Sequence, residues 1–156
     1  MKGNEQILGL LNELLANELT AINQYFVHAK MCQNWGYERL ATKLREESID
    51  EMRHADEIIG RILFLEGVPN LQRYHMLHVG ETVREQLESD LQLEYGAIAF
   101  LNQGVEAARK AGDNATEHMM TTILVSEEAH TDWIETQLEL IRQVGEQNYL
   151  AQQLKK

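Results

Sequence analysis

The motif Glu-x-x-His occurs twice in the sequence, and each copy follows another glutamate by 33 positions. The two motifs are Glu51 with His54 and Glu127 with His130, and the upstream acids are Glu18 and Glu94. Residues three apart share one face of a helix, so each motif can present a carboxylate and an imidazole in the same direction. Four carboxylates and two imidazoles are a ligand set that suits two divalent cations such as iron or manganese.

The equal spacing has a geometric meaning if each half of the chain is a helical hairpin. Two residues lie at the same height in a hairpin when they are equally far from its turn. The midpoints fall near residues 34–35 and 110–111, where the sequence has the turn-forming stretches Asn-Trp-Gly and Ala-Gly-Asp-Asn. All six residues would then lie in one layer across four helices.

Apolar residues recur every three or four positions through most of the chain, which predicts long amphipathic helices. We expect helices at about residues 5–34, 38–65, 81–111 and 115–144, and a short fifth helix at about 148–154. Residues 67–80 lack this periodicity, yet at roughly 3.3 Å per residue they can run the length of a long helix. The expected fold is therefore all-α, a single ferritin-like domain of residues 1–156 in which a four-helix bundle has a long crossover between its second and third helices.

Each of the four acids interrupts an apolar stripe, at a position where a core side chain is expected. In the third predicted helix, Glu94 falls between Leu91 and Ile98 in an unbroken rhythm of threes and fours. Such acids can belong to a buried salt-bridge network or to a metal centre. Few basic residues share these stripes, and unpaired buried carboxylates repel one another, so the pattern favours a metal centre.

The composition limits the classes of partner. The chain has 14 Lys and Arg against 25 Asp and Glu, a formal charge of −11, which disfavours nucleic acid and anionic membranes and favours cations. Cys32 is the only cysteine, which excludes an internal disulfide and fits a reducing cytoplasm. We find no secretory signal and no apolar run long enough to span a bilayer, so a cytoplasmic protein is expected.

Five segments of the sequence closely resemble the bacterioferritins. They are residues 17–26 (NELTAINQYF), 47–56 (ESIDEMRHAD), 61–72 (RILFLEGVPNLQ), 126–130 (SEEAH) and 148–150 (NYL). The resemblance covers essentially the whole chain and implies iron storage in a 24-subunit cage. It also implies a ferroxidase centre that oxidises Fe(II) with oxygen or hydrogen peroxide, haem b shared between two subunits, and a bacterioferritin-associated ferredoxin as electron donor.

The resemblance also implies roles for individual residues. Glu18 and Glu94 would be terminal iron ligands, Glu51 and Glu127 would bridge the two ions, and His54 and His130 would each complete one ion. Tyr25, seven residues after Glu18, corresponds to a tyrosine beside such centres. It is either a core tyrosine with a satisfied hydroxyl or a participant in electron transfer.

A second implied site concerns haem. Met52 points away from Glu51 and His54 on its helix, which by itself indicates packing at an interface. In the family, two such methionines hold the haem iron across a twofold axis, and the expected pocket walls are Ile22, Asn23, Phe26, Ile49 and Ile59.

Other positions depart from the family pattern. Relatives often have tyrosine and histidine where this chain has Arg45 and Glu46; Glu46 with Asp50 is still a candidate iron site on the inner surface of the cage. The unfamiliar linker stretch, residues 73–78, contains two histidines. We expect these, together with His28 and His118, to be solvated surface residues.

Two other functions fit the same residues. One is a di-iron peroxidase or oxygenase that acts on an external substrate and stores no iron, and the other is a haem-binding subunit of a mixed cage. A rubrerythrin-like peroxidase would need four cysteines for its second domain, and a DNA-protecting mini-ferritin would take its ligands from two subunits. The size of the assembly separates a storage cage from a small redox enzyme.

Overall fold

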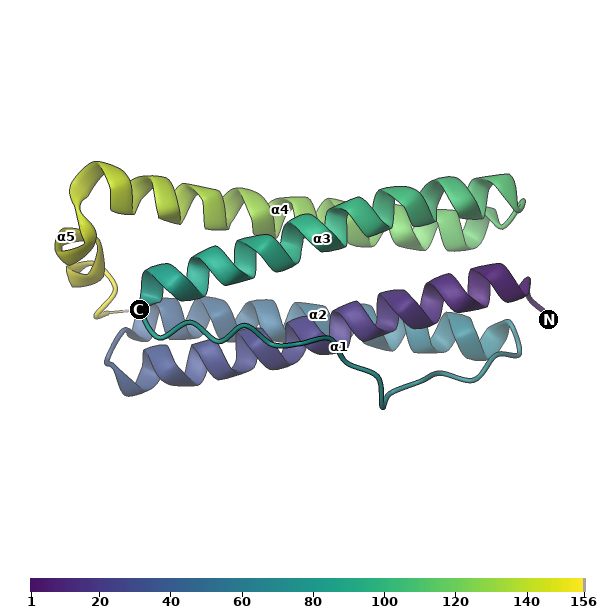
Figure 1. Ribbon diagram of the computed structural model, residues 1–156, viewed down its shortest axis with the longest axis horizontal. Coiled ribbons are helices and arrows are strands. Elements are labelled where there is room, and N and C mark those ends of the chain that lie inside the picture. Colours follow the sequence, from purple (N-terminus) through teal and green to yellow (C-terminus); the bar gives the residue numbers. More distant parts are fainter. Residues whose placement is uncertain (156) are drawn as a thin grey trace.

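The computed structural model describes residues 1–155, and in this part of the chain all regular structure is helical. The helices are α1 (Glu5–Asn34), α2 (Glu38–Phe64), α3 (Val83–Lys110), α4 (Asn114–Val144) and the short α5 (Glu146–Ala151). The first four form a bundle of two antiparallel hairpins, α1 with α2 and α3 with α4, and α5 folds across one end (Figure 1). The expected all-α bundle with a long crossover and a short last helix is confirmed.

Local capping fixes where the helices begin. The Asn4 side chain accepts hydrogen bonds from the backbone N–H groups of Gln6 and Ile7, and Asp113 caps α4 in the same way through Thr116. Thr82 caps α3, which explains why this helix begins two residues later than expected. Helix α5 begins directly after Gly145, whose φ of 86° ends α4, so it starts two residues earlier than expected.

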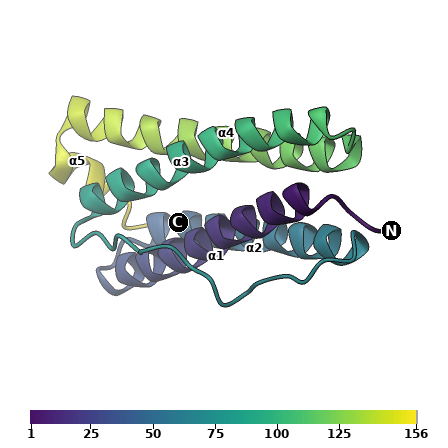
Figure 2. The same ribbon diagram turned by 45° about the vertical axis from the view of Figure 1, so that its right-hand side comes forward.

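The linker between α2 and α3 runs back along the outside of α1 (Figures 1 and 2). Side chains one or two turns apart on α1 bind the backbone of this linker. Thr20 Oγ1, Gln24 Oε1 and His28 Nε2 accept hydrogen bonds from the N–H groups of His75, His78 and Gly80, at 2.9, 3.1 and 3.0 Å. Gly80 lies so close to α3 that a Cβ there would be 2.3 Å from the backbone nitrogen of Gln86. The crossover is therefore a bound part of the bundle.

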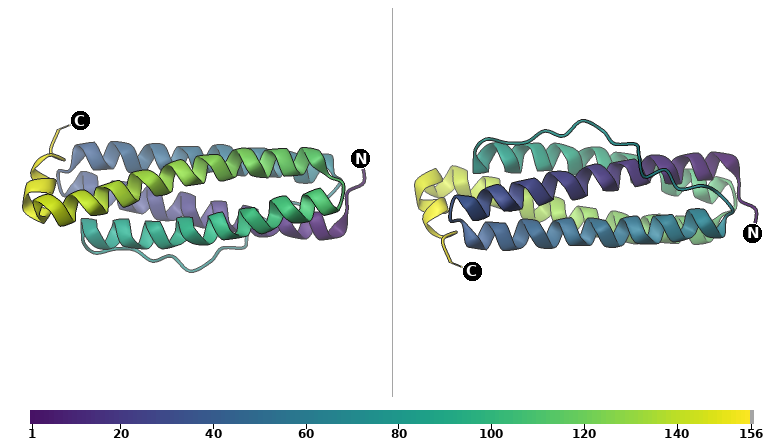
Figure 3. Two further views of the ribbon diagram at one scale, coloured as in Figure 1. Left: turned by 90° about the horizontal axis from the view of Figure 1, so that it is seen from above. Right: turned by 90° about the horizontal axis from the view of Figure 1, so that it is seen from below.

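Two hydrophobic clusters fill the bundle, one towards each end. One includes Ile7, Ile62 and Met120, near the N-terminus, and the other includes Leu40 and Tyr149, near α5. The N-terminus and the last helix lie at opposite ends of the bundle (Figure 3). The layer between them consists of polar side chains contributed by all four long helices. Among the described residues, no helix is long and apolar enough to cross a bilayer.

Candidate metal centre

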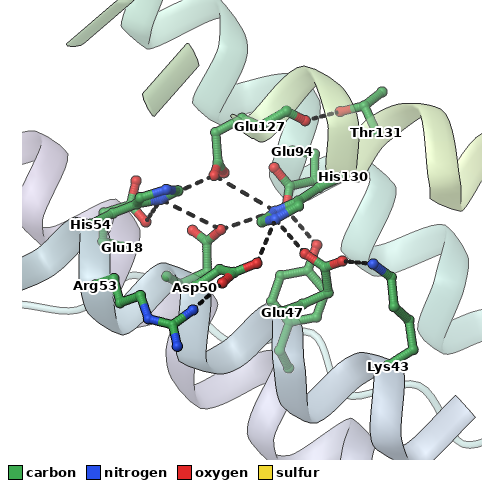
Figure 4. Close-up of polar contacts among 12 residues, drawn as sticks. Glu18, Lys43, Glu47, Asp50, Arg53, His54, Glu94, Glu127, His130 and Thr131 are labelled. Atoms are coloured by element: carbon green, nitrogen blue, oxygen red, sulfur yellow. Dashed lines mark hydrogen bonds and ion pairs between the residues drawn. The ribbon is translucent and has the colours of Figure 1, made fainter. Parts of the chain in front are cut away.

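The six residues of the two motifs meet in this polar layer. Glu18 comes from α1 and Glu94 from α3, while α2 and α4 each supply one Glu-x-x-His pair (Figure 4). All six side chains are buried, and Glu94 and Glu127 have no exposed surface. The structure thus brings together the complete set that the sequence spacing predicts.

The first group of potential ligands surrounds His54. Its Nδ1 lies 3.6 Å from Glu18 Oε2, 3.8 Å from Glu51 Oε1 and 3.3 Å from Glu127 Oε1. One ligand atom from each of the four residues lies within 4.8 Å of all the others. This spacing allows a single cation to touch all four side chains after small adjustments.

The second group surrounds His130 in the same way. Its Nδ1 lies 3.1 Å from Glu51 Oε1, 3.5 Å from Glu94 Oε1 and 3.7 Å from Glu127 Oε1. Glu51 and Glu127 therefore belong to both groups, and the two imidazole rings are 6.5 Å apart. Two cation sites that share two carboxylates are the arrangement of a dinuclear centre.

Crowding of the acids raises carboxyl pKa values in the absence of metal. Burial, and then the nearby charges of Glu18 and Glu127, raise the pKa of Glu51 well above its ordinary value. Burial raises the pKa of Glu94 to about 8; His130 opposes this shift and Glu127 adds to it. Glu94 therefore holds a proton at neutral pH unless a cation replaces it.

The pKa values of the two imidazoles are also raised, although burial acts in the opposite direction on them. Burial alone would lower the pKa of His54, but the carboxylates of Glu127 and Glu18 outweigh it and raise the pKa to about 10. For His130, the carboxylates of Glu47 and Glu94 overcome burial and raise the pKa to about 11. The metal-free layer therefore contains imidazolium ions that a metal must deprotonate.

Many polar atoms in this layer lack a well-oriented hydrogen bond within residues 1–155. The atoms are Glu18 Oε2, Glu47 Oε2, both carboxylate oxygens of Glu51 and of Glu127, Glu94 Oε2, and Nδ1 of His54 and of His130. Buried polar groups in proteins are almost always satisfied, so a cluster of orphaned acceptors needs a ligand. Carboxylate oxygens with a minority of imidazole nitrogens suit iron or manganese.

Tyr25 lies beside the second group. Its hydroxyl donates a hydrogen bond to Glu94 Oε1, and its ring meets the His130 ring edge to face. Burial and the adjacent Glu94 carboxylate raise the pKa of this phenol well above 10.0. Tyr25 is thus a neutral donor in direct contact with one of the central carboxylates.

Two further residues of α2 contact His130 on α4, and a third residue of α2 contacts the first of them. The other ring nitrogen of His130, Nε2, pairs closely with Glu47 Oε2 and lies 3.6 Å from Asp50 Oδ2. Lys43 Nζ is 2.7 Å from the second Glu47 oxygen. Neither Glu47 nor Lys43 is among the site residues predicted from the sequence, although Glu47 stands one helical turn before Glu51 and therefore on its face. Glu46 is exposed and outside the group of Glu47, Asp50 and His130.

The expectation that His28 is a solvated surface residue is wrong. Its side chain is fully buried, with Nδ1 2.9 Å from Asp90 Oδ1. Because Nε2 accepts the hydrogen bond from Gly80, Nδ1 has the proton and donates it to Asp90. Asp90 also accepts from Gln24 Nε2 at 2.9 Å. The reason for the burial is the crossover, which covers this part of α1.

The other three histidines are exposed. They are His75, which pairs with Glu13 at 3.1 Å, His78 and His118.

The residues expected to bind haem lie on the outer face of α1 and α2. Met52, Phe26 and Ile49 are 56, 49 and 41% exposed, which is high for apolar side chains. Asn23 is also exposed, whereas Ile22 and Ile59 are half-buried. The Arg45 guanidinium lies 5.5 Å from the centre of the Phe26 ring. This face therefore exposes three large apolar side chains, and one of them offers an accessible thioether.

Comparison with known proteins agrees with this architecture. The family model for the ferritin-like domain matches residues 8–144. The bacterioferritin of Mycobacterium bovis and bacterioferritin BfrA of Mycobacterium tuberculosis are each 50% identical to the chain over 152 residues, which is 97% of this chain and 96% of theirs. The bacterioferritin of Brucella melitensis is 46% identical over 149 residues, 96% of this chain and 92% of the relative. The chain therefore belongs to the bacterioferritins, a branch of the ferritin family.

Proposed function

We propose that this protein stores iron and that its central layer is a ferroxidase centre, which oxidises Fe(II) before the iron is deposited. The observation that carries the proposal is the pair of overlapping groups of buried, hydrogen-bond-deficient carboxylates, each completed by one imidazole. The similarity to proteins named bacterioferritin supports iron as the cargo.

In this proposal each iron ion takes one imidazole and one carboxylate of its own and shares two carboxylates. Glu18 and His54 serve one ion, Glu94 and His130 serve the other, and Glu51 and Glu127 bridge the two. Four ionised carboxylates balance two Fe(II) ions, so the loaded layer is electrically neutral. Because the charges compensate one another, the free-energy cost of burying them is reduced.

The reaction removes one electron from each Fe(II) ion. With oxygen as the oxidant, two electrons and two protons convert one O₂ into hydrogen peroxide; with peroxide, they convert one H₂O₂ into two waters. Each ferric ion gains one unit of positive charge, which favours uptake of hydroxide or loss of a water proton at the centre. Tyr25 contacts Glu94 directly, so it can keep that carboxylate in place.

Storage requires a cavity, and we infer the 24-subunit cage of the family, located in the cytoplasm. We further propose that haem b binds between two subunits at the exposed face around Met52, with Phe26 and Ile49 against its rings. The accessible thioether and its apolar surroundings fit such a group. Bound haem would supply one-electron transfer for the reduction of stored iron, with a small ferredoxin as the donor.

Anaerobic titration with Fe(II), followed by exposure to oxygen, tests the ferroxidase proposal. The protein should take up two iron ions per chain in a fast phase, and Glu127→Ala should abolish that phase by removing a shared ligand. Glu128→Ala is the matched control, because it removes an exposed acid at the next position of the same helix. Equal fast uptake in the two variants contradicts the assignment of the centre.

Gel filtration after repeated iron additions separates storage from a redox enzyme without storage. A storage protein should elute as a large cage and retain iron far beyond two ions per chain. A small assembly that turns over peroxide and retains only two ions per chain would favour the di-iron redox enzyme instead.

A further inference from the structure

Lys43 stands at the end of a row of contacts that leads from the central layer to the surface. His130 faces the other ligands through Nδ1, and its Nε2 meets Glu47 (Figure 4). The second oxygen of Glu47 is 2.7 Å from Lys43 Nζ. The Glu47 side chain is only 2% exposed, whereas that of Lys43 is 35% exposed. Lys43 is therefore the cation that pairs with a buried carboxylate next to the centre.

We propose that Lys43 is a positioning residue for His130 and acts through Glu47. This inference rests on the proposed function, because it assumes that His130 is a metal ligand. It adds a residue outside the ligand set whose charge determines how tightly the His130 side of the centre holds a cation.

The physical argument starts from the imidazole. A histidine that binds metal through one nitrogen is oriented by the hydrogen bond that its other nitrogen donates, and a carboxylate acceptor also makes the ring a stronger ligand. Glu47 Oε2 is the carboxylate oxygen that pairs with Nε2 here. It can orient the ring only while its own side chain is fixed. Lys43 fixes it, because the ammonium group holds the second carboxylate oxygen at 2.7 Å.

Loss of the Lys43 side chain would leave Glu47 with His130 as its main charged partner. The carboxylate would then be free to rotate and turn toward solvent, since a buried carboxylate is stable only with well-placed partners. His130 would lose the group that orients its ring, so we expect weaker binding at the group of Glu94 and His130.

The location of Lys43 is itself well defined. Its ammonium group lies 5.3 Å from the centre of the Trp133 ring, which adds a cation–π contact to the ion pair. Arg53 offers a contrast on the same helix: it pairs at 2.8 Å with Asp50, but its side chain is 71% exposed and that of Asp50 is 40% exposed. The two cations differ in whether their partner carboxylate is buried against His130.

Titration with Co(II) tests the inference, because this ion is not oxidised by oxygen and its absorption spectrum reports imidazole and carboxylate ligation. In Lys43→Met, binding of one of the two Co(II) ions should weaken by about tenfold, the lower end of the range for partners that orient a ligand. Lys43→Arg should restore binding to within a small factor of the wild type. The control Arg53→Met removes one positive charge from the same helix and should leave binding unchanged or slightly tighter, since less positive charge favours cations.

Removal of Lys43 has two possible effects on cation binding, and they have opposite signs. Loss of His130 positioning weakens binding, whereas loss of a nearby positive charge strengthens it, so the measured direction separates them. Weaker binding in Lys43→Met than in both the wild type and Arg53→Met supports the inference. Equal or tighter binding in Lys43→Met shows that Lys43 acts only as a distant charge and overturns it. Lys43→Gln provides a second neutral variant if the methionine variant does not assemble. Failure of the wild type to bind two Co(II) ions would instead reject the proposed function.

Discussion

Loading two divalent cations into the central layer should expel protons at neutral pH. In the metal-free protein the pKa values of His54 and His130 are about 10 and 11, and that of Glu94 is about 8, so each of these groups holds a proton at pH 7. Burial and its acidic neighbours raise the pKa of Glu51 as well. At least three of the six side chains therefore hold a proton at pH 7 before metal binds.

The magnitude follows from the three groups with pKa values above 7. His54, His130 and Glu94 must each lose a proton to bind a cation, so about three protons leave when both ions bind. Each released proton makes the overall binding constant about tenfold stronger per pH unit, which for three protons is about 4 kcal/mol per unit. Binding therefore strengthens as pH rises. The slope should become shallower above the Glu94 pKa of about 8, where that carboxyl group is already ionised.

Co(II) is the suitable probe for this exchange, because oxidation and hydrolysis of iron release protons of their own. The protein is titrated in weakly buffered solution with a pH indicator, and calorimetry in two buffers of different ionisation enthalpy gives an independent proton count. Glu94→Gln should release about one proton fewer, since its amide does not ionise. The exposed variant Glu128→Gln should release the wild-type number.

A release of fewer than about one proton per cation at pH 7 would refute the reasoning. It would mean that the metal-free carboxylates are already ionised and the imidazoles already neutral. The layer would then have to tolerate several uncompensated charges, and burial would not have the effect on the pKa values that we assign to it.

Three further predictions concern stability and haem. The raised pKa values of His54 and His130 stabilise the metal-free fold fully below pH 6.5, and this contribution is lost as pH rises towards 10 and 11; calorimetry of chelator-treated protein should give a lower melting temperature near pH 9 than near pH 6. His28→Leu leaves Asp90 buried without its main partner and should cost about 3 kcal/mol in denaturant unfolding, with partial recovery when Asp90→Asn is added. Met52→Leu should abolish the haem absorption band while cage size is unchanged; a retained band would exclude Met52 as the ligand.

The sequence predicts the main ligand set because helical periodicity is a local property. Glu94 interrupts an apolar stripe on its own helix. Residues equally far from a turn lie at the same height in a hairpin, so the position of Glu94 also identifies its partner on the neighbouring helix. Both arguments need only the chain order and the geometry of a hairpin, so they identify the six residues before any packing is known.

The residues around the ligand set depend on contacts that periodicity does not encode. Glu47 lies on the same helix face as Glu51, but its contact with His130 depends on how closely α2 approaches α4. The burial of His28 depends on the path of the crossover. The sequence does contain an indication that His28 is buried. Tyr25 lies four residues after Ala21 and His28 three residues after Tyr25, so the three share one helix face, and the first two are buried. Lys43 and Glu47 also have the spacing of a helical ion pair, although only the structure shows that one partner is buried.

Each of the two ligand groups draws on both hairpins. Glu127 of the second hairpin reaches the group around His54, and Glu51 of the first reaches the group around His130. A cation in either group would link the two hairpins, so their separation would have to break coordination bonds as well as core packing. The rate at which the hairpins separate can be measured by amide hydrogen exchange in the buried parts of α1 and α4. That rate should therefore fall as the metal occupancy of the centre rises.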